Sequence, residues 1–500
     1  MNLTGKTLMK KVLMFTALSI MLVSLAVPAQ AVIPALVGPL AALISVLPQI
    51  LAFVGIGMLA ILKPGTYRAL LTIAWQHKII TTIILLSVTI SSGFFIYQAV
   101  SPNVNIIATT SKDLQLSSIS QSWATFRGGI HRTGHQANHL GPTDANLLWA
   151  FIDREAAVMD FSSSPAVVGN RLYIGAGRGS LFRTDGLVYC LDVKTGNVIW
   201  KSKSPQQIFS SPAIVGGRVY IGEGLHYDVD SSLRCLDANT GQEIWNFQTA
   251  SHVESSPCID RGRVYFGAGD DGVYCLDALE GKEIWHYTNL HVDISPIVVD
   301  GKLYFGTGYG QPKIYAVSAE NGSDIWVKSV DLPVWGSPTI SGELIYFGLG
   351  NGNFVDSHQV PTGGVVALNL KTGEEVWSFQ TEDAVLTAIS FLKDYVYFGC
   401  RDGYVYALDA KTGDIFWKSS IDTPIVSSPA VTKDSIYFGG TNGVIYCLEA
   451  ETGDMNWWYN TDDISSEIKI YSSPAVANGK LYIGSSNRYL FCLGDTTPTN

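Results

Sequence analysis

A repeated segment constrains the fold of this chain more than any other feature of its sequence. Ser427–Trp457 is one complete copy, in which short alternating strands flank the dipeptide Asn442-Gly443. An Asn-Gly pair between two apolar runs is a strong hairpin signal, because a tight type I′ turn needs positive φ at both central residues. A second turn at Gly453 leads to a fourth strand that contains Trp457. One such sheet cannot bury both of its faces in water, so the copies must stack on one another.

Three recurring positions mark the copies. The Tyr of a Y-[IF]-G strand recurs at Tyr173, Tyr220, Tyr265, Tyr304, Tyr346, Tyr397, Tyr437 and Tyr482. A small residue in the following strand recurs at Cys190, Cys235, Cys275, Ala316, Ala367, Ala407, Cys447 and Cys492. A closing Trp recurs at Trp200, Trp245, Trp285, Trp326, Trp377, Trp417 and Trp457. A period of about 40–50 residues with four strands per copy is typical of propeller blades.

The strand count predicts how the ring closes. Eight copies supply the first three strands, but only seven of them are followed by a closing Trp strand. The missing Trp is Trp149, which precedes the first copy in the segment Asn146–Phe151. We therefore predict an all-β fold, an eight-bladed propeller of four-stranded antiparallel blades, in which this N-terminal strand completes the last blade.

The region before the repeats lacks charge over long intervals. No charged residue lies between Lys11 and Lys63, an interval long enough for two spans of about 20 residues, and a further uncharged run extends from Ile79 to Ser111. The basic residues before and between these runs favour the cytoplasmic side, which places the propeller on the periplasmic or extracellular side of the cytoplasmic membrane. We predict a signal peptide or first transmembrane helix in 1–31, two transmembrane helices with a short cytoplasmic loop in 32–100, a polar tether in 101–122, the propeller in 123–494 and a tail in 495–500.

The cysteines and the net charge exclude two kinds of chemistry. Five of the seven cysteines occupy one equivalent strand position, which Ala fills in the other three blades. Equivalent positions in different blades lie farther apart than the Cα–Cα reach of a disulfide, about 7 Å, so we predict buried free thiols. The net charge of −10 argues against a nucleic-acid partner.

The turn before each closing Trp carries a recognisable motif. The segment Cys190–Trp200 reads CLDVKTGNVIW, which resembles the tryptophan-docking motif A-x-D-x-x-T-G-x-x-x-W of the pyrroloquinoline-quinone (PQQ)-type propeller repeats. Cys235–Trp245 and Ala407–Trp417 match it equally well, and the segment W-A-T-F-R-G-G from Trp123 is similar to the lead-in of bacterial members. The resemblance implies that each Trp, including Trp149, docks in the wedge between neighbouring blades.

The family that this motif resembles contains two functional classes. Its dehydrogenases are marked by an adjacent Cys-Cys disulfide over the quinone, a calcium site and often a C-x-x-C-H haem motif, whereas BamB-like members are non-enzymatic scaffolds. This chain has neither adjacent cysteines nor C-x-x-C-H. We therefore expect a membrane-anchored scaffold without a cofactor that binds a protein or peptide at its loop face. The alternative is a quinoprotein dehydrogenase that uses PQQ and Ca²⁺ at the channel mouth; a sensor is a weaker third possibility.

The residue before each S-S-P motif or its variant predicts a ring at the mouth of the central channel. Glu254 and Asp293 come from adjacent blades and could hold Ca²⁺ or act as an acid–base pair, with Trp335 as a stacking floor. The alternative, which we favour, is a solvated rim with one aromatic plug. The whole ring is Ser162, Phe209, Glu254, Asp293, Trp335, Leu386, Val426 and Tyr471, of which Glu254, Asp293, Trp335, Phe209 and Tyr471 are the candidate binding residues.

Three blades have a longer hairpin between their second and third strands, on the same face as this ring. Loops on a rigid scaffold commonly carry recognition, although insertions that contact nothing are an equal alternative. The side chains expected to be exposed there are Arg178, Arg183, His226, Tyr227, Phe354 and His358. His131, His135 and His139 have a spacing that would suit zinc only on a helix, which Gly134 and Gly141 disfavour, so we predict no metal site.

Overall fold

The computed structural model describes residues 104–106, 122–129, 132–136, 140–156, 158–178, 185–226, 228–463 and 469–496. Contacts divide the chain into two units, 1–100 and 101–500, and only the second contains described residues. The predicted signal peptide and transmembrane helices therefore lie outside the described residues, as does most of the tether. Within the described part, no helix has the length and apolar character needed to cross a membrane.

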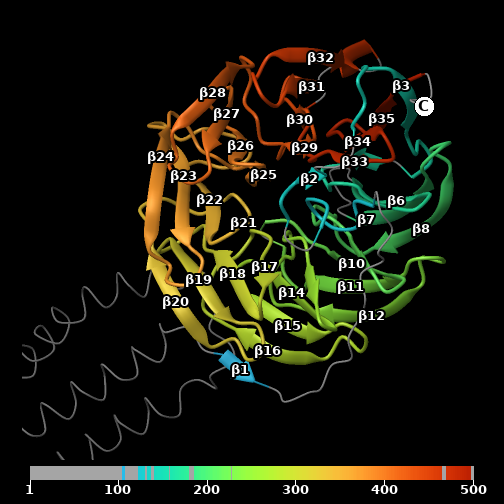
Figure 1. Cartoon of the computed structure of the whole chain (residues 1–500). Coiled ribbons are helices and arrows are strands. Elements are labelled where there is room, and N and C mark those ends of the chain that lie inside the picture. Colours follow the sequence, from blue (N-terminus) through green and yellow to red (C-terminus); the bar gives the residue numbers. More distant parts are fainter. Residues whose placement is uncertain are drawn as a thin grey trace, which may run out of the picture. The chain divides into compact units, whose positions relative to one another are not determined.

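Eight antiparallel sheets are arranged around a centre, as Figure 1 shows, and each supplies one blade. Blade 1 contains β5 (Ala166–Val168), β6 (Arg171–Arg178), β7 (Gly186–Asp192) and β8 (Val198–Ser204), with β4 (Val158–Asp160) on the end of β6. Blade 2 contains β9 (Ala213–Val215), β10 (Arg218–Gly222), β11 (Ser232–Asp237) and β12 (Glu243–Gln248). Blade 3 contains β13 (Cys258–Asp260), β14 (Arg263–Gly267), β15 (Val273–Asp277) and β16 (Glu283–Tyr287). Blade 4 contains β17 (Ile297–Val299), β18 (Lys302–Gly306), β19 (Lys313–Ser318) and β20 (Asp324–Ser329).

The second half of the ring repeats the same order. Blade 5 contains β21 (Thr339–Ser341), β22 (Leu344–Gly350), β23 (Gly363–Asn369) and β24 (Glu375–Thr381). Blade 6 contains β25 (Ser390–Leu392), β26 (Tyr395–Gly399), β27 (Tyr404–Asp409) and β28 (Ile415–Ser420). Blade 7 contains β29 (Ala430–Thr432), β30 (Ser435–Gly439), β31 (Val444–Glu449) and β32 (Met455–Asn460), followed by the 3-10 helix η2 (Thr461–Asp463). Blade 8 contains β33 (Ala475–Ala477), β34 (Lys480–Gly484), β35 (Leu490–Gly494) and β3 (Leu147–Phe151). The predicted eight-bladed, all-β fold is confirmed.

The three marker positions lie side by side in each blade. In blade 3, Tyr265 pairs with Cys275, which pairs with Trp285 on the outer strand. The register shifts directly after Cys275, and a shift follows the small residue at the same place in blades 1, 2, 4, 5, 6 and 7. Such a bulge bends the strand and changes the direction of the side chains beyond it. The small residue is buried throughout, and all seven cysteines are buried free thiols.

The closing tryptophans join each blade to the next, as the docking motif implies. Each indole Nε1–H donates to a backbone oxygen of the following blade, in seven cases within the motif turn, and the adjacent Tyr hydroxyl shares that oxygen in most blades. In blade 1, Trp200 and Tyr173 both donate to Ala238, at 3.1 Å. The indole acceptors in chain order from Trp149 are Val193, Ala238, Ala278, Ala319, Leu370, Ala410, Ala450 and Pro142.

A glycine is required where the Trp meets the next turn. Gly241 has φ +72°, and a Cβ built there would lie 2.4 Å from the Trp200 ring. The T-G pair of the motif therefore supplies both the left-handed turn and the space for the indole.

The S-S-P motifs link the inner ends of the blades. In seven of the eight junctions, the backbone N–H of the last residue before Pro or Ile donates to a Ser Oγ in the next blade, for example Ser211 to Ser256 at 3.0 Å. The series includes Ser473 to Ser164 at 2.9 Å, between blades 8 and 1. At the remaining junction, Ala388 occupies the position of the acceptor serine and has no hydroxyl group.

Strand β3 lies in the last sheet, far from its neighbours in sequence. It pairs antiparallel with β35, and Trp149 lies opposite Cys492 in the usual Trp–small-residue register. Two indole bonds join this N-terminal segment to the neighbouring blades, at what we call the seam of the ring. Trp457 of blade 7 donates to Pro142 at 3.3 Å, and Trp149 donates to Val193 of blade 1 at 3.2 Å.

Residues of the lead-in bond to the inner strands of several blades. The guanidinium of Arg127 donates to Pro429 and Ile389, and that of Arg132 donates to Ser256 and Pro257, all at 2.7–2.9 Å. Strand β2 (His135–Gln136) pairs parallel with β29, so His135 lies on a strand rather than a helix. Figure 1 shows the described parts of the lead-in at the centre of the ring. The lead-in therefore fills part of the channel and ties blades together from inside.

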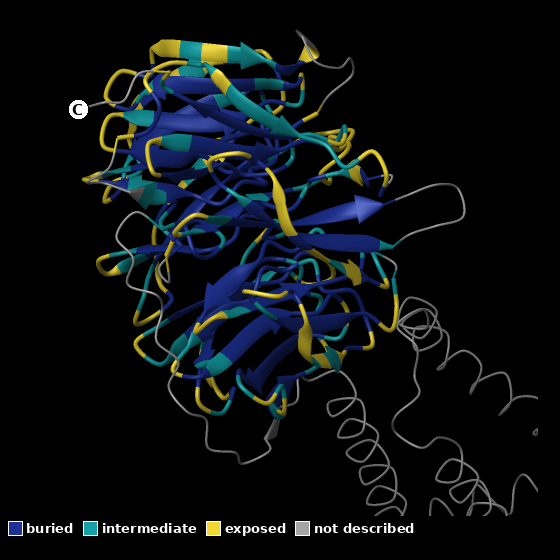
Figure 2. Ribbon diagram, turned by 90° about the vertical axis from the view of Figure 1, so that its right-hand side faces the viewer, coloured by how far each residue is buried: buried dark blue, intermediate teal, exposed yellow. Residues whose placement is uncertain are grey.

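Burial follows the position of a strand within its blade. Inner and middle strands are buried, whereas most outer strands alternate exposed and half-buried residues (Figure 2). The exception is β16, where Ile284, Trp285 and Tyr287 are buried. There β1 (Val104–Ile106), from the predicted tether, pairs antiparallel with the outer edge of β16.

Candidate functional site

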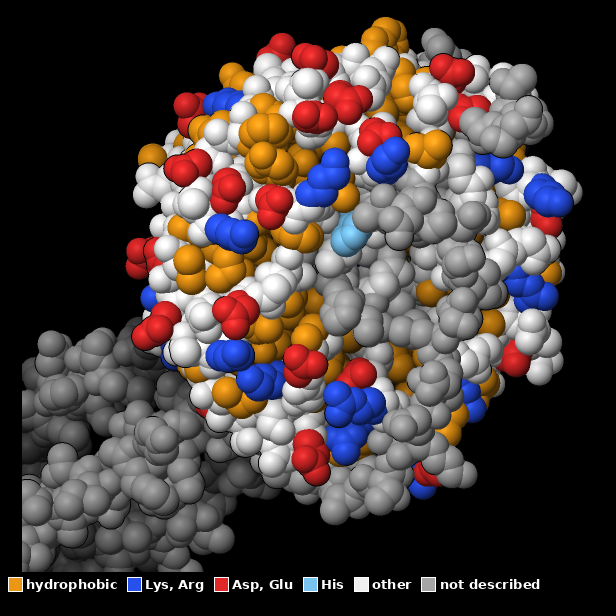
Figure 3. Space-filling view, in the orientation of Figure 1, with side chains coloured by type: hydrophobic (Ala, Val, Ile, Leu, Met, Phe, Trp, Pro, Cys, Tyr) orange, Lys and Arg blue, Asp and Glu red, His pale blue; other side chains and the backbone are white. Residues whose placement is uncertain are grey.

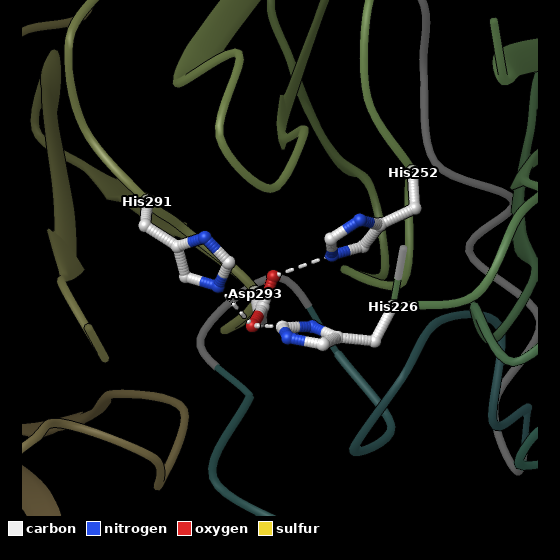
Figure 4. A group of neighbouring side chains, drawn as sticks. All are labelled: His226, His252, His291 and Asp293. Carbon is white, nitrogen blue, oxygen red and sulfur yellow. Dashed lines mark hydrogen bonds and ion pairs between the residues drawn. The ribbon is translucent and has the colours of Figure 1, made fainter. Parts of the chain in front are cut away.

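Three histidines and one aspartate meet at the channel mouth between blades 2, 3 and 4. His226 lies in the long hairpin between β10 and β11, and His252 lies in the link from β12 to β13. His291 and Asp293 both lie in the next link, from β16 to β17. Figure 4 shows the three imidazoles around the carboxylate of Asp293. We call these four residues the His₃Asp cluster.

The carboxylate of Asp293 is the centre of the cluster. Its Oδ1 lies 2.9 Å from Nε2 of His252, and its Oδ2 lies 2.7 Å from Nε2 of His291. Nδ1 of His226 is 3.9 Å from the same Oδ2. If one ligand atom is taken from each residue, the four atoms lie within 4.8 Å of one another. The cluster is therefore compact enough to bind a single ion.

The outward-facing nitrogens of two imidazoles also have partners. Nδ1 of His291 lies 2.7 Å from Oδ1 of Asp270, and Nδ1 of His252 lies 3.2 Å from the Ser251 hydroxyl. Such contacts on the far side of the ring fix its orientation. Nε2 of both rings is thereby held toward Asp293.

Burial and mutual contacts perturb the pKa values in the cluster. Burial alone would lower the pKa of His291, but its bonds to Asp270 and Asp293 outweigh burial and raise the pKa to about 10. Burial would raise the pKa of Asp293, yet the hydrogen bonds from His252 and His291 hold it well below its usual range. Burial lowers the pKa of His226 despite the nearby charge of Asp293. Strongly perturbed groups that gather at one point are typical of functional sites.

Glu254 joins the cluster from the same link as His252. Its Oε1 accepts a hydrogen bond from the backbone N–H of His226 at 2.5 Å, which ties the long hairpin to the mouth. Burial, followed by the negative charge of Asp293, raises the pKa of Glu254 to about 7. Glu254 is therefore close enough to Asp293, its neighbour in the predicted ring, for the two charges to interact.

An aromatic group borders the cluster on the blade 4 side. The ring of Tyr309 packs against His291 and His226, with centroids 4.9 and 5.5 Å apart. Tyr309 and Phe354 each pack edge-on against Trp335, at 5.2 and 6.2 Å. Trp335 itself is buried, and its Nε1 donates to Gly350. Trp335 therefore lies beneath other aromatic rings.

The other side of the mouth is apolar. Trp335, Ala384, Leu386 and Val426 form one buried cluster, and Tyr471 packs against it. Of the two remaining ring positions, Phe209 is half-buried, and Ser162 bonds to Asp160 through its amide. Phe209 and Tyr471 are thus at the mouth, outside the His₃Asp cluster.

The long-hairpin predictions have mixed outcomes. His226 reaches the cluster, and Phe354 and His358 are exposed in the β22–β23 hairpin. The expectation of exposure is wrong for Arg178, which is the last residue of β6 and is buried. Its Nη1 lies 3.6 Å from Oδ2 of Asp185. Arg183 and Tyr227 lie outside the described residues, as do His131 and His139.

The sequence reasoning missed His252 and His291, although a signal was present. Two consecutive blades read H-V-E and H-V-D immediately before their S-S-P and I-S-P segments. In an extended chain, residues two apart point to the same side. Each carboxylate of the predicted ring therefore has a histidine beside it on the same side of the chain.

The cluster does not match the quinone and calcium site of the dehydrogenase alternative. Ca²⁺ takes oxygen ligands, whereas this group offers three imidazole nitrogens. The seven cysteines are buried free thiols, so none forms the adjacent disulfide that marks those enzymes. The residues of the His₃Asp cluster therefore do not fit the quinone and its calcium ion.

The fold and the docking motif together define a PQQ-type propeller with a polar site at its channel mouth. The family described as "Outer membrane protein assembly factor BamB" matches residues 137–288 and 292–497, which is well over half of the chain. The chain belongs to this family. A search of curated proteins finds no match.

Solved structures share the fold at low sequence identity. BamB from Moraxella catarrhalis is 18% identical, with a TM-score of 0.57 over 71% of this chain and 99% of that chain. The quinohemoprotein alcohol dehydrogenase from Comamonas testosteroni is 14% identical, with a TM-score of 0.58 over 76% and 82%. A computationally designed protein, Ika8, is 16% identical, with a TM-score of 0.57 over 70% and 99%. At these identities, the likeness extends to the fold alone.

Proposed function

We propose that this protein is a non-enzymatic, membrane-anchored scaffold that binds a protein or peptide at the loop face of its propeller. Membership of the BamB family supports the scaffold role. The uncharged runs before the propeller support an anchor in the cytoplasmic membrane, with the propeller on its outer side. The tether would let the propeller reach a partner near the membrane.

The observation that carries this proposal is a pair of exposed aromatic side chains at the mouth. Tyr309 is 46% exposed and Phe354 is 42% exposed, although both pack on the buried ring of Trp335. Aromatic residues on a rigid base are favoured anchors in protein interfaces, because they bury a large area at a low cost in conformational entropy. Val355 extends the apolar surface of the same hairpin.

We also propose that β3 closes the ring. Its pairing with β35 and the indole bonds across the seam support this role. A ring tied at its ends holds the mouth residues of all blades at fixed distances, which is the property that a binding scaffold needs.

A photo-crosslinking experiment tests the docking face. A photoreactive phenylalanine analogue at Phe354, in the full chain in its native membrane, should give one discrete adduct on irradiation. The matched control is Ile325, which is 43% exposed on the outer strand of blade 4. Figure 3 shows that apolar side chains occur in several separate groups on the molecular surface, so a rim control is essential. No adduct at Phe354, or the same adducts at both positions, would reject the loop face as the docking site.

The dehydrogenase alternative has its own test. PQQ and Ca²⁺ added to the purified protein should produce no alcohol-dependent dye reduction. Reduction at rates usual for quinoproteins would replace the scaffold proposal with the enzyme. The solved dehydrogenase structures support only the shared fold.

A further inference from the structure

The His₃Asp cluster brings four metal-binding side chains to one point from three separate segments. The segments are the β10–β11 hairpin and the two links that enter blades 3 and 4. We propose that His226, His252, His291 and Asp293 bind a divalent first-row transition-metal ion, with Zn²⁺ as the best match. This inference does not depend on the scaffold role proposed above.

The donor set selects the class of metal. Three imidazole nitrogens and one carboxylate oxygen suit Zn²⁺ and its neighbours in the first transition row. Ca²⁺ and Mg²⁺ favour sites made of oxygen ligands. Four protein ligands are also the usual number for a tetrahedral zinc ion.

The distances are close to those that a bound ion needs. Zinc–nitrogen and zinc–oxygen bonds of 2.0–2.2 Å place neighbouring ligand atoms about 3.3 Å apart in a tetrahedron. Oδ1 of Asp293 lies 2.9 Å from Nε2 of His252, and its Oδ2 lies 2.7 Å from Nε2 of His291 and 3.9 Å from Nδ1 of His226. With one ligand atom taken from each residue, all four lie within 4.8 Å of one another. Small side-chain rotations would therefore convert the hydrogen-bonded group into a coordination sphere.

The surroundings of the histidines match those of metal ligands. A metal-binding His commonly donates its other N–H to a carboxylate or another oxygen, which fixes the tautomer and the ring plane. His291 has Asp270 in that position at 2.7 Å, and His252 has Ser251 at 3.2 Å. The hydrogen bond from the backbone N–H of His226 to Oε1 of Glu254 holds the third segment, the β10–β11 hairpin, in place.

The site combines burial with a route for entry. The side chains of His252, His291 and Asp293 are 2%, 8% and 10% exposed, so bulk water competes little for the ion. The side chain of His226 is 33% exposed and marks the open side. An ion can thus enter beside His226 and be held by three groups fixed on the rigid ring.

Metal analysis of the full chain purified in detergent tests this proposal. The protein is stripped with a chelator, reloaded with Zn²⁺, and its metal content is measured after gel filtration. We expect about one ion per chain in the native protein and less than about one tenth of that in His291→Gln. Asp270→Asn should bind about 10–100-fold more weakly, because the substitution removes the partner that orients His291. Titration with Co²⁺ should give the visible absorption of a tetrahedral site, which excess Ca²⁺ leaves unchanged.

The matched control is His358→Gln, which removes an exposed histidine of the β22–β23 hairpin and should retain the native metal content. Asp270 is half exposed at its side chain, so Asp270→Asn decides the question even where His291→Gln does not fold. Equal metal content in His291→Gln and His358→Gln, native affinity in Asp270→Asn, or displacement of Co²⁺ by Ca²⁺ would overturn the proposal.

Discussion

The wedges between blades and the mouth of the channel are both built from eight equivalent positions, but they differ in how far side chains vary. A Trp occupies every wedge and makes the same bond to the next blade. The mouth carries a different kind of residue in almost every blade, from Asp293 to Leu386. A wedge side chain must fit the same docking turn in seven of the eight wedges, whereas the mouth positions share no such turn. The repeat therefore fixes the backbone positions at the mouth but not the type of residue that occupies each of them.

The largest effect on stability is expected in a wedge. Trp285 is fully buried, so Trp285→Ala should lower the free energy of unfolding by about 3–5 kcal/mol. Glu254→Gln at the mouth should change it by less than about 1 kcal/mol, because the amide oxygen can still accept the bond from His226. Denaturant unfolding of the two variants measures the difference. Equal losses would show that the mouth is as tightly constrained as the wedge.

The next effect separates the two regions by ligand rather than by packing. At a Zn²⁺ concentration 100 times its Kd, binding should stabilise the native protein by about 2.7 kcal/mol. Asp293→Asn should abolish most of this increment, whereas Trp417→Ala should lower the baseline and keep the increment. Thermal unfolding with and without Zn²⁺ checks both. An increment that survives in Asp293→Asn would place the ion elsewhere.

Two glycines separate the effect of a left-handed backbone from the effect of contact with a wedge Trp. Gly241 and Gly301 share φ +72°, but only Gly241 faces a Trp ring, at 2.4 Å from its would-be Cβ. Gly301→Ala should cost about 1–2 kcal/mol from the left-handed backbone alone. Gly241→Ala should cost about 1–3 kcal/mol more, because the methyl group displaces Trp200. Similar unfolding free energies for the two variants would mean that the wedge adapts easily.

The smallest effect concerns the Tyr hydroxyls beside the indoles. The hydroxyl of Tyr397 donates to Ala450 at 3.2 Å, whereas that of Tyr482, at the seam, is buried with no hydrogen-bond partner among the described residues. Tyr397→Phe should lower the free energy of unfolding by about 0.5–1.5 kcal/mol, and Tyr482→Phe should leave it nearly unchanged. A clear loss in Tyr482→Phe would indicate that the seam is bonded like the other junctions.

The wedge was predictable from the sequence because its chemistry repeats. The spacing from Tyr265 through Cys275 to Trp285 recurs around the ring, so the pattern predicted the blade count, and the resemblance to the docking motif implied the position of each Trp. The mouth was only partly predictable. Counting back from S-S-P located Glu254 and Asp293, since backbone positions repeat there too.

The sequence could not predict contacts that do not follow the repeat. The approach of His226 to Asp293 depends on the path of a single long hairpin. The burial of Arg178 depends on where β6 ends, which varies with hairpin length. The bonds from Arg127 to Pro429 and Ile389 join residues far apart in sequence that no period relates.

The central claim is that the ring of repeats holds a single metal site at its mouth. Anomalous diffraction from crystals of the Zn²⁺-loaded protein tests this claim most directly. Data collected on either side of the zinc absorption edge should give a single strong difference peak per chain, within bonding distance of His226, His252, His291 and Asp293. A map without a peak between these four side chains, while the ring itself is intact, would contradict the account.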